Sequence, residues 1–291
     1  MSTMSSSPES THAVTVMIAR EHADELEAWI RDAWAVPVVQ FERPGAVDVR
    51  LDLYLESAAA SALACRVLEE RPGVKAVAGL HLGSREWEEI WKKHFSRHLI
   101  GEGLEICPVW EADEPPPGGR KRVLVNPGMS FGTGEHFTTR FCLEMLEGLC
   151  HQSPPDSLLD VGTGSGILAI AAAKLGVPRI TATDSDIQAV ETAKGNAKLN
   201  GVGTVVDFGE ADITLSPAGG PYDVVCANLY AGILIEAATV LLRAAGQHLI
   251  VSGIRDVEVD GVADTFLRLG ARELVRDGEG EWTGLMLATN G

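Results

Sequence analysis

One short segment, residues 158–176, limits the possible folds more than any other part of the chain. It reads LLDVGTGSGILAIAAAKLG: an apolar run, then Gly162, Gly164 and Gly166, then an alanine-rich stretch with helical character. Glycines at this place let the backbone turn sharply from a strand into a helix, and they let a ligand lie against the bare main chain. The segment therefore predicts a strand–loop–helix unit in an α/β sheet, with a ligand at the loop.

The same alternation continues from residue 137 to the end of the chain. Strand-like segments are 157–162, 179–184, 204–210, 222–229, 247–253, 271–277 and 282–288, and helical segments are 138–149, 166–175, 186–200, 232–244 and 256–269. Alternation of this kind predicts a mainly parallel, doubly wound, Rossmann-like sheet with helices on both faces. Only GEGE separates the last two strands, so we expect them to form an antiparallel hairpin at one edge.

The N-terminal third has a different pattern. Residues 13–82 follow the order β-α-β-β-α-β, which is typical of the ferredoxin-like, split βαβ unit. They contain no catalytic constellation, so we expect a small α+β domain for substrate recognition or packing. The predicted organisation is a disordered leader (1–12), this domain (13–82), a linker helix with an aromatic stripe (83–104) and an α/β catalytic domain (105–291).

Charge and composition exclude several classes of function. Lys and Arg number 24 against 41 Asp and Glu, so the formal net charge is −17. A strongly acidic surface repels phosphate backbones, which disfavours direct nucleic-acid binding and favours a basic protein partner. Solubility alone is the other explanation of this acidity. The chain offers no evidence on oligomeric state beyond an expectation of a monomer.

Targeting signals and metal motifs are weak. The N-terminus lacks a basic region followed by an apolar stretch, and the longest apolar run, GILAIAAAKLG, is interrupted by Lys174, so we expect neither secretion nor a membrane span. Five scattered cysteines without a C-x-x-C motif favour a reducing cytoplasm. His94 and His98 are four residues apart but lack a third nearby ligand, so we expect no metal site.

The spacing of the glycines and one acidic residue indicate the ligand. The loop reads G-x-G-x-G, whereas the dinucleotide fingerprint needs its third glycine one residue later. Asp160 stands two residues before the first glycine, where a carboxylate disfavours phosphates and suits a cation. S-adenosylmethionine has an ammonium group and a positively charged sulfur, so it is the cofactor that this loop predicts.

Polar residues follow the next strands at their carboxyl ends, where α/β sheets bind ligands. Asp184 is placed to accept hydrogen bonds from ribose hydroxyls, and Asp186 is a candidate helix cap. Asp212 is a candidate acceptor for an adenine amino group, with a solvated loop acid as the alternative. Asn228 can hold an amine with its lone pair toward a methyl group, with a turn-forming role as the alternative.

These motifs carry a resemblance to a known family. LLDVGTGSGILAIAAAKLG, TDSDIQAVETAKGNAKLNGV and ANLYAG resemble the class I S-adenosylmethionine-dependent methyltransferases. NPGMSFGTGEHFTTR (126–140), WEEIWKKHF and the C-terminal segment resemble the PrmA family, the methyltransferases of ribosomal large-subunit protein eleven. The resemblance covers about residue 84 to the end of the chain. In the N-terminal part only the βαββαβ pattern matches.

The resemblance implies roles for particular positions. Thr139, Gly162, Asp184 and Asn228 match cofactor-contact positions of the family, and the 126–140 loop is implied to fold over the cofactor. Its lid positions beside the methyl group are Phe131, Gly132, Thr133 and Gly134. His136 matches a family histidine without an assigned role.

Three positions depart from common family residues, namely Glu135, Phe137 and Tyr230. Tyr230 is interpreted either as an aromatic face near the amine or the sulfonium, or as a packing residue.

The expected function is methyl transfer from S-adenosylmethionine to lysine ε-amines, or to the α-amine, of a basic ribosomal large-subunit protein. Within the class, the alternative is methylation of another protein lysine or of a small amine. Outside the class, the alternatives are a NAD-dependent oxidoreductase and a non-enzymatic ribosome-assembly factor. The sequence does not indicate which lysines are modified or how many methyl groups are added.

Overall fold

The structure is a computed structural model, and it describes residues 11–34, 36, 38–41, 47–55, 57–82, 97–125, 136–215 and 219–289. The chain divides into two compact units, residues 1–94 and 95–291. Each unit has its own hydrophobic core, so we describe them separately.

The N-terminal unit is a four-stranded antiparallel sheet with two helices. Its elements are β1 (Thr11–Ala19), α1 (Arg20–Trp34), β2 (Val38–Phe41), β3 (Asp48–Leu55), α2 (Ala58–Glu69) and β4 (Val74–Leu82). The strand order is β2-β3-β1-β4, which is the arrangement of a split βαβ unit. Strand β1 begins at Thr11, inside the segment predicted to be a disordered leader, because Thr11 pairs with Leu82 of β4.

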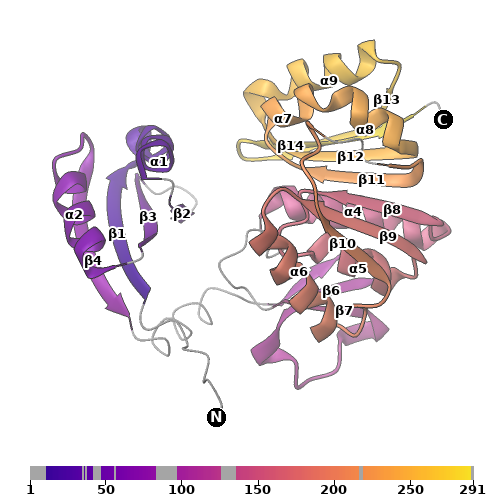
Figure 1. Ribbon diagram of the computed structural model, residues 1–291, viewed down its shortest axis with the longest axis horizontal. Helices are drawn as coiled ribbons and strands as arrows, with labels where there is room; N and C mark the ends of the chain where they lie inside the picture. The colour runs from indigo at the N-terminus through magenta and orange to yellow at the C-terminus, as the bar shows by residue number, and fades with distance from the viewer. Residues whose placement is uncertain are drawn as a thin grey trace. The chain divides into compact units, whose positions relative to one another are not determined.

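Period-two burial explains how this small sheet holds its helices. Val14, Val16 and Ile18 on β1 are fully buried, whereas Thr15 and Met17 between them are partly exposed. The buried side chains form one cluster with residues of both helices, such as Ile30 and Leu68. Both helices therefore cover the same face of the sheet (Figure 1).

A three-stranded sheet opens the second unit and corrects one sequence prediction. It consists of β5 (His98–Ile100), β6 (Leu104–Pro108) and β7 (Lys121–Val125), in the order β5-β6-β7. The linker helix was predicted to extend to residue 104, but residues 98–100 form a strand. Pairing with β6 overrides the helical spacing here, because it buries Ile100 completely. The rest of the predicted helix, residues 83–96, lies outside the described residues.

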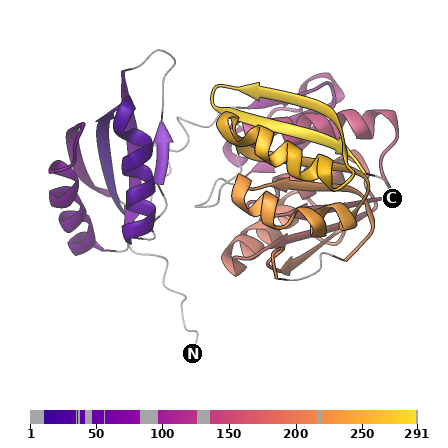
Figure 2. The same cartoon turned by 90° about the horizontal axis from the view of Figure 1, so that it is seen from above.

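The main sheet has seven strands in the order β10-β9-β8-β11-β12-β14-β13. Its strands are β8 (Ser157–Val161), β9 (Arg179–Asp184), β10 (Val206–Glu210), β11 (Tyr222–Asn228), β12 (Ala245–Arg255), β13 (Arg272–Glu279) and β14 (Trp282–Ala288). Strands β8 to β12 are parallel, and β14 lies antiparallel between β12 and β13. The predicted α/β sheet and its edge hairpin, drawn in yellow in Figure 2, are confirmed.

Helices cover both faces of this sheet (Figure 1). They are α4 (Phe137–Gln152), α5 (Ile167–Leu175), α6 (Ile187–Leu199), α7 (Ala231–Glu236), α8 (Ala238–Ala244) and α9 (Val259–Arg268). One buried cluster joins the sheet to α4, α5 and the small sheet, and another joins it to α7, α8 and α9. The single helix predicted over 232–244 is two helices that meet at Ala237. No helix among the described residues is long and apolar enough to cross a bilayer.

Candidate functional site

The glycine loop leaves strand β8 and enters helix α5, as the sequence predicts. Gly162, Gly164 and Gly166 have φ angles of 70°, 53° and 82°, which only glycine adopts at low cost. A Cβ on Gly162 would lie 2.4 Å from Cδ2 of Leu229, and a Cβ on Gly166 would lie 3.0 Å from Cβ of Ala193. The loop is therefore a bare main-chain cradle at the carboxyl edge of the sheet.

Asp160 is a buried carboxylate in contact with this cradle. Its side chain is 1% exposed, and its Oδ2 accepts hydrogen bonds from Thr163 Oγ1 (2.6 Å) and Ala169 N (3.3 Å). Its Oδ1 is buried without a hydrogen-bond partner among the described residues. Burial raises the pKa of Asp160 to about 6, and the nearby Asp184 charge adds to this effect. A cationic ligand near the loop would stabilise the ionised carboxylate.

Asp184, at the end of β9, supports the cradle from the neighbouring strand. Its Oδ2 accepts a hydrogen bond from Gly164 N (2.9 Å), and its Oδ1 accepts one from Asp186 N (3.0 Å). Each carboxylate oxygen keeps a second acceptor position, so the predicted contact with ribose hydroxyls stays a prediction. Asp186 caps α6 by accepting from Gln188 N (2.8 Å), which confirms its predicted capping role.

Asp212 closes a turn after β10. Its Oδ1 accepts hydrogen bonds from the backbone N and the hydroxyl of Thr214 at 2.8 and 2.7 Å. These bonds lower the pKa of Asp212. A bond from Ala211 N to Asp184 O (2.9 Å) keeps this turn beside the end of β9. Contact with an adenine amino group stays a prediction, because the turn already explains the residue.

Asn228 lies at the carboxyl end of β11 and contacts the first turn of α4. Its Nδ2 lies 3.4 Å from both Thr138 Oγ1 and Thr139 Oγ1. Both threonines are 1% exposed. The structure therefore brings Asn228 together with Thr139, two residues that are far apart in the sequence. Leu229, which follows Asn228, packs against Gly162 and so places this pair beside the cradle.

Gly253 is a site residue that the sequence analysis missed. It has φ +82° and lies where the pairing of β12 with β14 shifts register between Val251 and Ile254. A Cβ on Gly253 would lie 2.6 Å from Leu229 O and 3.0 Å from Asn228 Oδ1. The bulge therefore makes room for the end of β11. A lone glycine inside the apolar strand LIVSGIR is the signal that predicts such a bulge.

Three further residues that the sequence singled out, His136, Phe137 and Tyr230, lie next in sequence to Thr138 or Leu229 or close to them. His136 caps α4, and its ring packs edge-on against Trp282 with 5.1 Å between ring centroids. Tyr230 is the N-cap residue of α7 and is 62% exposed, so its ring is not part of the buried core, and its role near the amine or the sulfonium stays a prediction. Phe137 is buried and packs against Phe141.

The predicted lid positions Phe131, Gly132, Thr133 and Gly134 lie outside the described residues. So does the rest of residues 126–135, including Glu135. Within the described residues, no three His, Cys, Asp or Glu side chains are arranged to hold a metal ion. His98 is in strand β5, and its predicted neighbour His94 is not among the described residues.

The residues present fit S-adenosylmethionine. Bare main chain at Gly162 and Gly164 admits a ligand that any side chain would exclude. The unpartnered Oδ1 of Asp160 supplies negative charge without a competing donor, which suits a cationic ligand better than a phosphate. Gly162, Gly164, Asp160 and Asp184 are the residues that would hold this cofactor.

Sequence comparisons match the chain to ribosomal protein L11 methyltransferases. The sequence model of the family "Ribosomal protein L11 methyltransferase (PrmA)" matches residues 9–289. The chain is 44% identical over 208 residues to the ribosomal protein L11 methyltransferase of Geobacter sulfurreducens, covering 71% of this chain and 67% of that protein. It is 40% identical over 232 residues to the Pelobacter propionicus protein of the same name, covering 76% and 73%.

A solved structure agrees with the sequence comparisons. The crystal structure of the ribosomal protein L11 methylase from Lactobacillus delbrueckii subsp. bulgaricus superposes with a TM-score of 0.59 at 29% identity, covering 68% of this chain and all of that one. The family match spans nearly the whole sequence. The chain belongs to the ribosomal protein L11 methyltransferase (PrmA) family, whose members are S-adenosylmethionine-dependent class I methyltransferases.

Proposed function

We propose that this enzyme methylates lysine ε-amines, and the N-terminal α-amine, of ribosomal protein L11. The relatives at 40% identity or more are named for that substrate. The observation that carries the proposal is the position of Asn228, whose side-chain amide lies between the first turn of α4 and Leu229 beside the glycine cradle. An amide at this place suits a nitrogen nucleophile, since its oxygen accepts an N–H without removing a proton.

S-adenosylmethionine supplies an activated methyl group on a positively charged sulfur, so direct transfer to nitrogen needs neither a metal ion nor a covalent enzyme intermediate. The residues of the chain bind, orient and exclude water. Gly162 and Gly164 leave space for the cofactor, Asp160 and Asp184 provide carboxylates, and Asn228 aligns the incoming nitrogen.

The substrate amine must arrive without its proton. A lysine ammonium has an ordinary pKa of about 10.4 and an α-amine one of about 8. Desolvation favours the neutral amine, because burial disfavours the charged form. We therefore expect the rate to rise with pH as the free amine becomes more abundant.

The N-terminal unit is proposed to bind the protein substrate. Both of its helices cover one face of the sheet, which leaves Thr15, Arg50 and Asp52 on the other face. There Asp52 is 4% exposed and accepts hydrogen bonds from Thr15 Oγ1 (2.8 Å) and Arg50 Nε (2.8 Å). This network holds the partly exposed side chains of Thr15 and Arg50 in place on that face.

The charge of the whole chain, −17, would help to attract a basic ribosomal protein and disfavours direct nucleic-acid binding. We propose action as a monomer in the bacterial cytoplasm. All five cysteines are free thiols, which suits a reducing compartment.

The test uses purified L11 and S-adenosylmethionine carrying a labelled methyl group, with mass spectrometry to locate the added methyls. We expect methyl groups on lysines or the N-terminal amine of L11. Asn228→Ala should lower the rate by roughly 100-fold while calorimetry shows cofactor affinity within about threefold of the parent. Wild-type rates in Asn228→Ala would remove this residue from the chemistry.

The same assay separates the remaining alternative within the class. Methylation of a mixture of other ribosomal proteins or of small amines, with L11 left unmodified, would indicate a different acceptor. The family assignment argues against the NAD-dependent oxidoreductase and the non-enzymatic assembly factor. Heat of binding with NAD, and none with S-adenosylmethionine, would contradict the proposal.

A further inference from the structure

We infer that Thr138 is a positioning residue: together with His136 it orients the amide of Asn228 so that Oδ1, and not Nδ2, faces the substrate nitrogen. This inference rests on the proposed function of the site. It follows from the direction of three hydrogen bonds, two between His136 and Thr138 at the start of α4 and one between Thr138 and Asn228 at the end of β11.

The first of these hydrogen bonds, at His136, determines which atoms donate and which accept in the other two. Its Nδ1 lies 3.4 Å from the backbone N of Thr138 and caps helix α4. A backbone N–H only donates, so Nδ1 has to present a lone pair. The ring proton therefore lies on Nε2 in the neutral form. Burial and the nearby Arg140 lower the pKa of His136, against the opposing charge of Glu279, which favours this neutral form.

The hydroxyl of Thr138 forms the second of the three hydrogen bonds. Its Oγ1 lies 2.8 Å from His136 Nδ1. Since Nδ1 is an acceptor, the hydroxyl donates its only proton to the ring, and its oxygen can then only accept further bonds. Thr138 is 1% exposed, so solvent has little access to this oxygen.

The amide of Asn228 supplies the third hydrogen bond, which it donates to the Thr138 hydroxyl oxygen. The Thr138 oxygen needs a donor, and Asn228 Nδ2 lies 3.4 Å from it and 3.4 Å from Thr139 Oγ1. The amide nitrogen is thereby assigned to the α4 side. Oδ1 then lies on the other side of the amide, close to Gly253 and to the end of β11.

This orientation has a chemical consequence. A neutral amine must keep its lone pair free for the methyl group, so its partners should accept N–H bonds and not donate to the nitrogen. Oδ1 accepts such a bond, whereas a rotated amide would present Nδ2 and compete for the lone pair. The series therefore selects the productive amide orientation before substrate binds.

Protonation of His136 would reverse the bond between its Nδ1 and Thr138 Oγ1. A proton on Nδ1 would donate to Thr138 Oγ1 and free the hydroxyl proton to donate toward Asn228, which favours the rotated amide. Among the described residues, the charged groups that shift the pKa of His136 are Arg140 from α4 and Glu279 from β13, and Trp282 from β14 packs on the ring. Activity should fall in acid as the ring becomes protonated.

The first experiment compares Thr138→Val, which keeps the shape and removes the hydroxyl, with Thr138→Ser, which keeps the hydroxyl. The matched control is Thr192→Val, where a threonine on α6 donates to Gln188 O away from the site. We expect kcat to fall roughly 10- to 100-fold in Thr138→Val, with cofactor affinity and melting temperature close to the parent. Thr138→Ser should recover most of the rate, and Thr192→Val should match the parent.

Two kinetic results and one binding result of this experiment overturn the inference. One is a parent-like kcat in Thr138→Val. The other is an equal loss in Thr138→Ser and Thr138→Val, since the methyl group and not the hydroxyl would then matter. A loss of cofactor affinity as large as the loss of kcat would also contradict it, because Thr138 would then be a cofactor contact.

The second experiment needs no methyl transfer. Nitrogen-15 NMR of the ligand-free protein, with Asn228→Ala and His136→Gln used for assignment, reports the ring tautomer and the Asn228 side-chain NH₂. We expect an unprotonated Nδ1, and an Asn228 NH₂ resonance that shifts with the titration of His136. Thr138→Val should abolish that coupled shift, whereas Thr192→Val should retain it.

The NMR outcome separates the two proposals. A protonated Nδ1 in the neutral ring, or an Asn228 resonance that ignores His136, overturns the positioning role even if the enzyme methylates L11. A coupled shift in a protein that methylates no amine keeps the positioning role and rejects the proposed substrate class.

Discussion

The two ends of the parallel strands in the seven-stranded sheet, carboxyl and amino, differ in how far the hydrogen-bonding capacity of their carboxylates is satisfied. At the carboxyl ends of the parallel strands, the Asp160 side chain is buried, and in the part of the chain that the structure describes its Oδ1 has no hydrogen-bond partner. At the amino ends, Asp223 accepts hydrogen bonds from Asp156 N (2.7 Å), Ser157 N (3.2 Å) and Gln247 Nε2 (3.0 Å). One carboxylate has unused capacity for a ligand, whereas the other is used in holding strands together.

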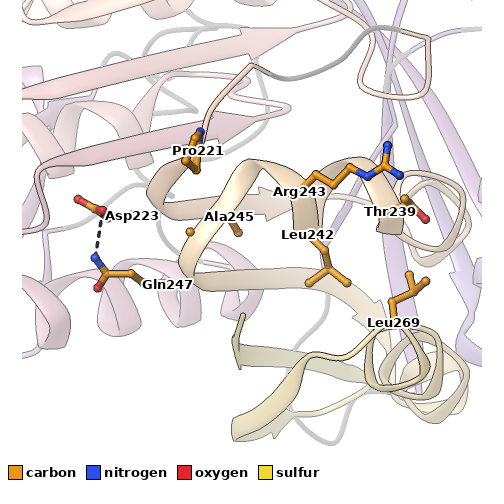
Figure 3. A pocket seen from close by; sticks show the side chains of 9 residues that line it. Pro221, Asp223, Thr239, Leu242, Arg243, Ala245, Gln247 and Leu269 are labelled. Carbon is orange, nitrogen blue, oxygen red and sulfur yellow. Dashed lines mark hydrogen bonds between the residues drawn. The ribbon is translucent and has the colours of Figure 1, made fainter. Parts of the chain in front are cut away.

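A cavity lies at the end of the sheet where Asp223 has its hydrogen-bond partners. A cavity of about 660 Å³ opens beside α8 and the start of β12 (Figure 3). The side chains and backbone that line it are those of Pro221, Asp223, Thr239, Leu242, Arg243, Ala245, Gly246, Gln247 and Leu269. The dashed bond in Figure 3 shows that Gln247 is already paired with Asp223. Hollow volume alone is therefore a poor guide to this protein's chemistry, and unsatisfied polar atoms beside bare backbone are a better one.

Among these variants, Gly162→Ala at the carboxyl ends of the strands should cause the largest loss of cofactor affinity. The new Cβ would lie 2.4 Å from the Leu229 side chain, at a φ of 70° that disfavours alanine by about 1–2 kcal/mol. We expect cofactor affinity to fall at least about tenfold, which corresponds to about 1.4 kcal/mol. Calorimetry with S-adenosylmethionine measures it.

The matched control is Gly195→Ala, in the interior of α6, where a Cβ meets no atom within 4 Å. That variant should bind the cofactor normally and be about 0.5–1 kcal/mol more stable. Equal affinities in both glycine variants would show that the cradle is not the binding loop.

Asp160→Asn should have an intermediate effect and a characteristic pH dependence. The folded pKa of Asp160, about 6, exceeds the ordinary value of about 3.9. Its contribution to stability is therefore complete below about pH 4 and is lost as the pH rises through 6. The free energy of unfolding of the parent should fall by about 2–3 kcal/mol across this range relative to the variant.

Urea denaturation of both proteins at a series of pH values measures this difference. At pH 7 the variant should also bind S-adenosylmethionine several-fold more weakly, because a cation loses its nearby carboxylate. Parallel pH curves would show that Asp160 ionises as freely in the folded protein as in the unfolded chain.

Asp223→Ala should have the smallest effect on binding. Removal of the carboxylate leaves three donors without their acceptor, at a cost in stability of about 1–3 kcal/mol. Cofactor affinity should stay within about twofold of the parent, since the residue lies at the other end of β11 from Asn228. A large loss of affinity in a folded variant would mean that the two ends are coupled.

Much of the fold is predictable from local patterns. The strand and helix periodicity of residues 137–291 and the glycine loop after β8 each depend on neighbours in the sequence, so the seven-stranded α/β sheet is correctly predicted. The errors occur where tertiary pairing decides. Residues 98–100 form a strand because β6 is available as a partner, and β1 begins at Thr11 because β4 extends that far.

The candidate site shows the same division. Position at a strand end makes Asp184 and Asn228 recognisable, because carboxyl ends of parallel strands meet at one edge. Gly253 was missed because its importance comes from its closeness to Asn228 Oδ1 and Leu229 O, on a different strand. Thr138 was missed for a similar reason, since its proposed role depends on hydrogen bonds of its hydroxyl to His136 and to Asn228, which is 90 residues away.

The sequence by itself determined the order of strands and helices, the glycine cradle and the polar residues at the strand ends, since periodicity and backbone freedom are local properties. Only the tertiary structure decided which of those residues share a hydrogen bond, which carboxylate oxygen stays unpartnered and which way an amide points. Those properties depend on groups 20 to 90 residues apart in the chain, as in the pairs Gly164–Asp184 and Thr138–Asn228, and such groups become neighbours only when the sheet assembles.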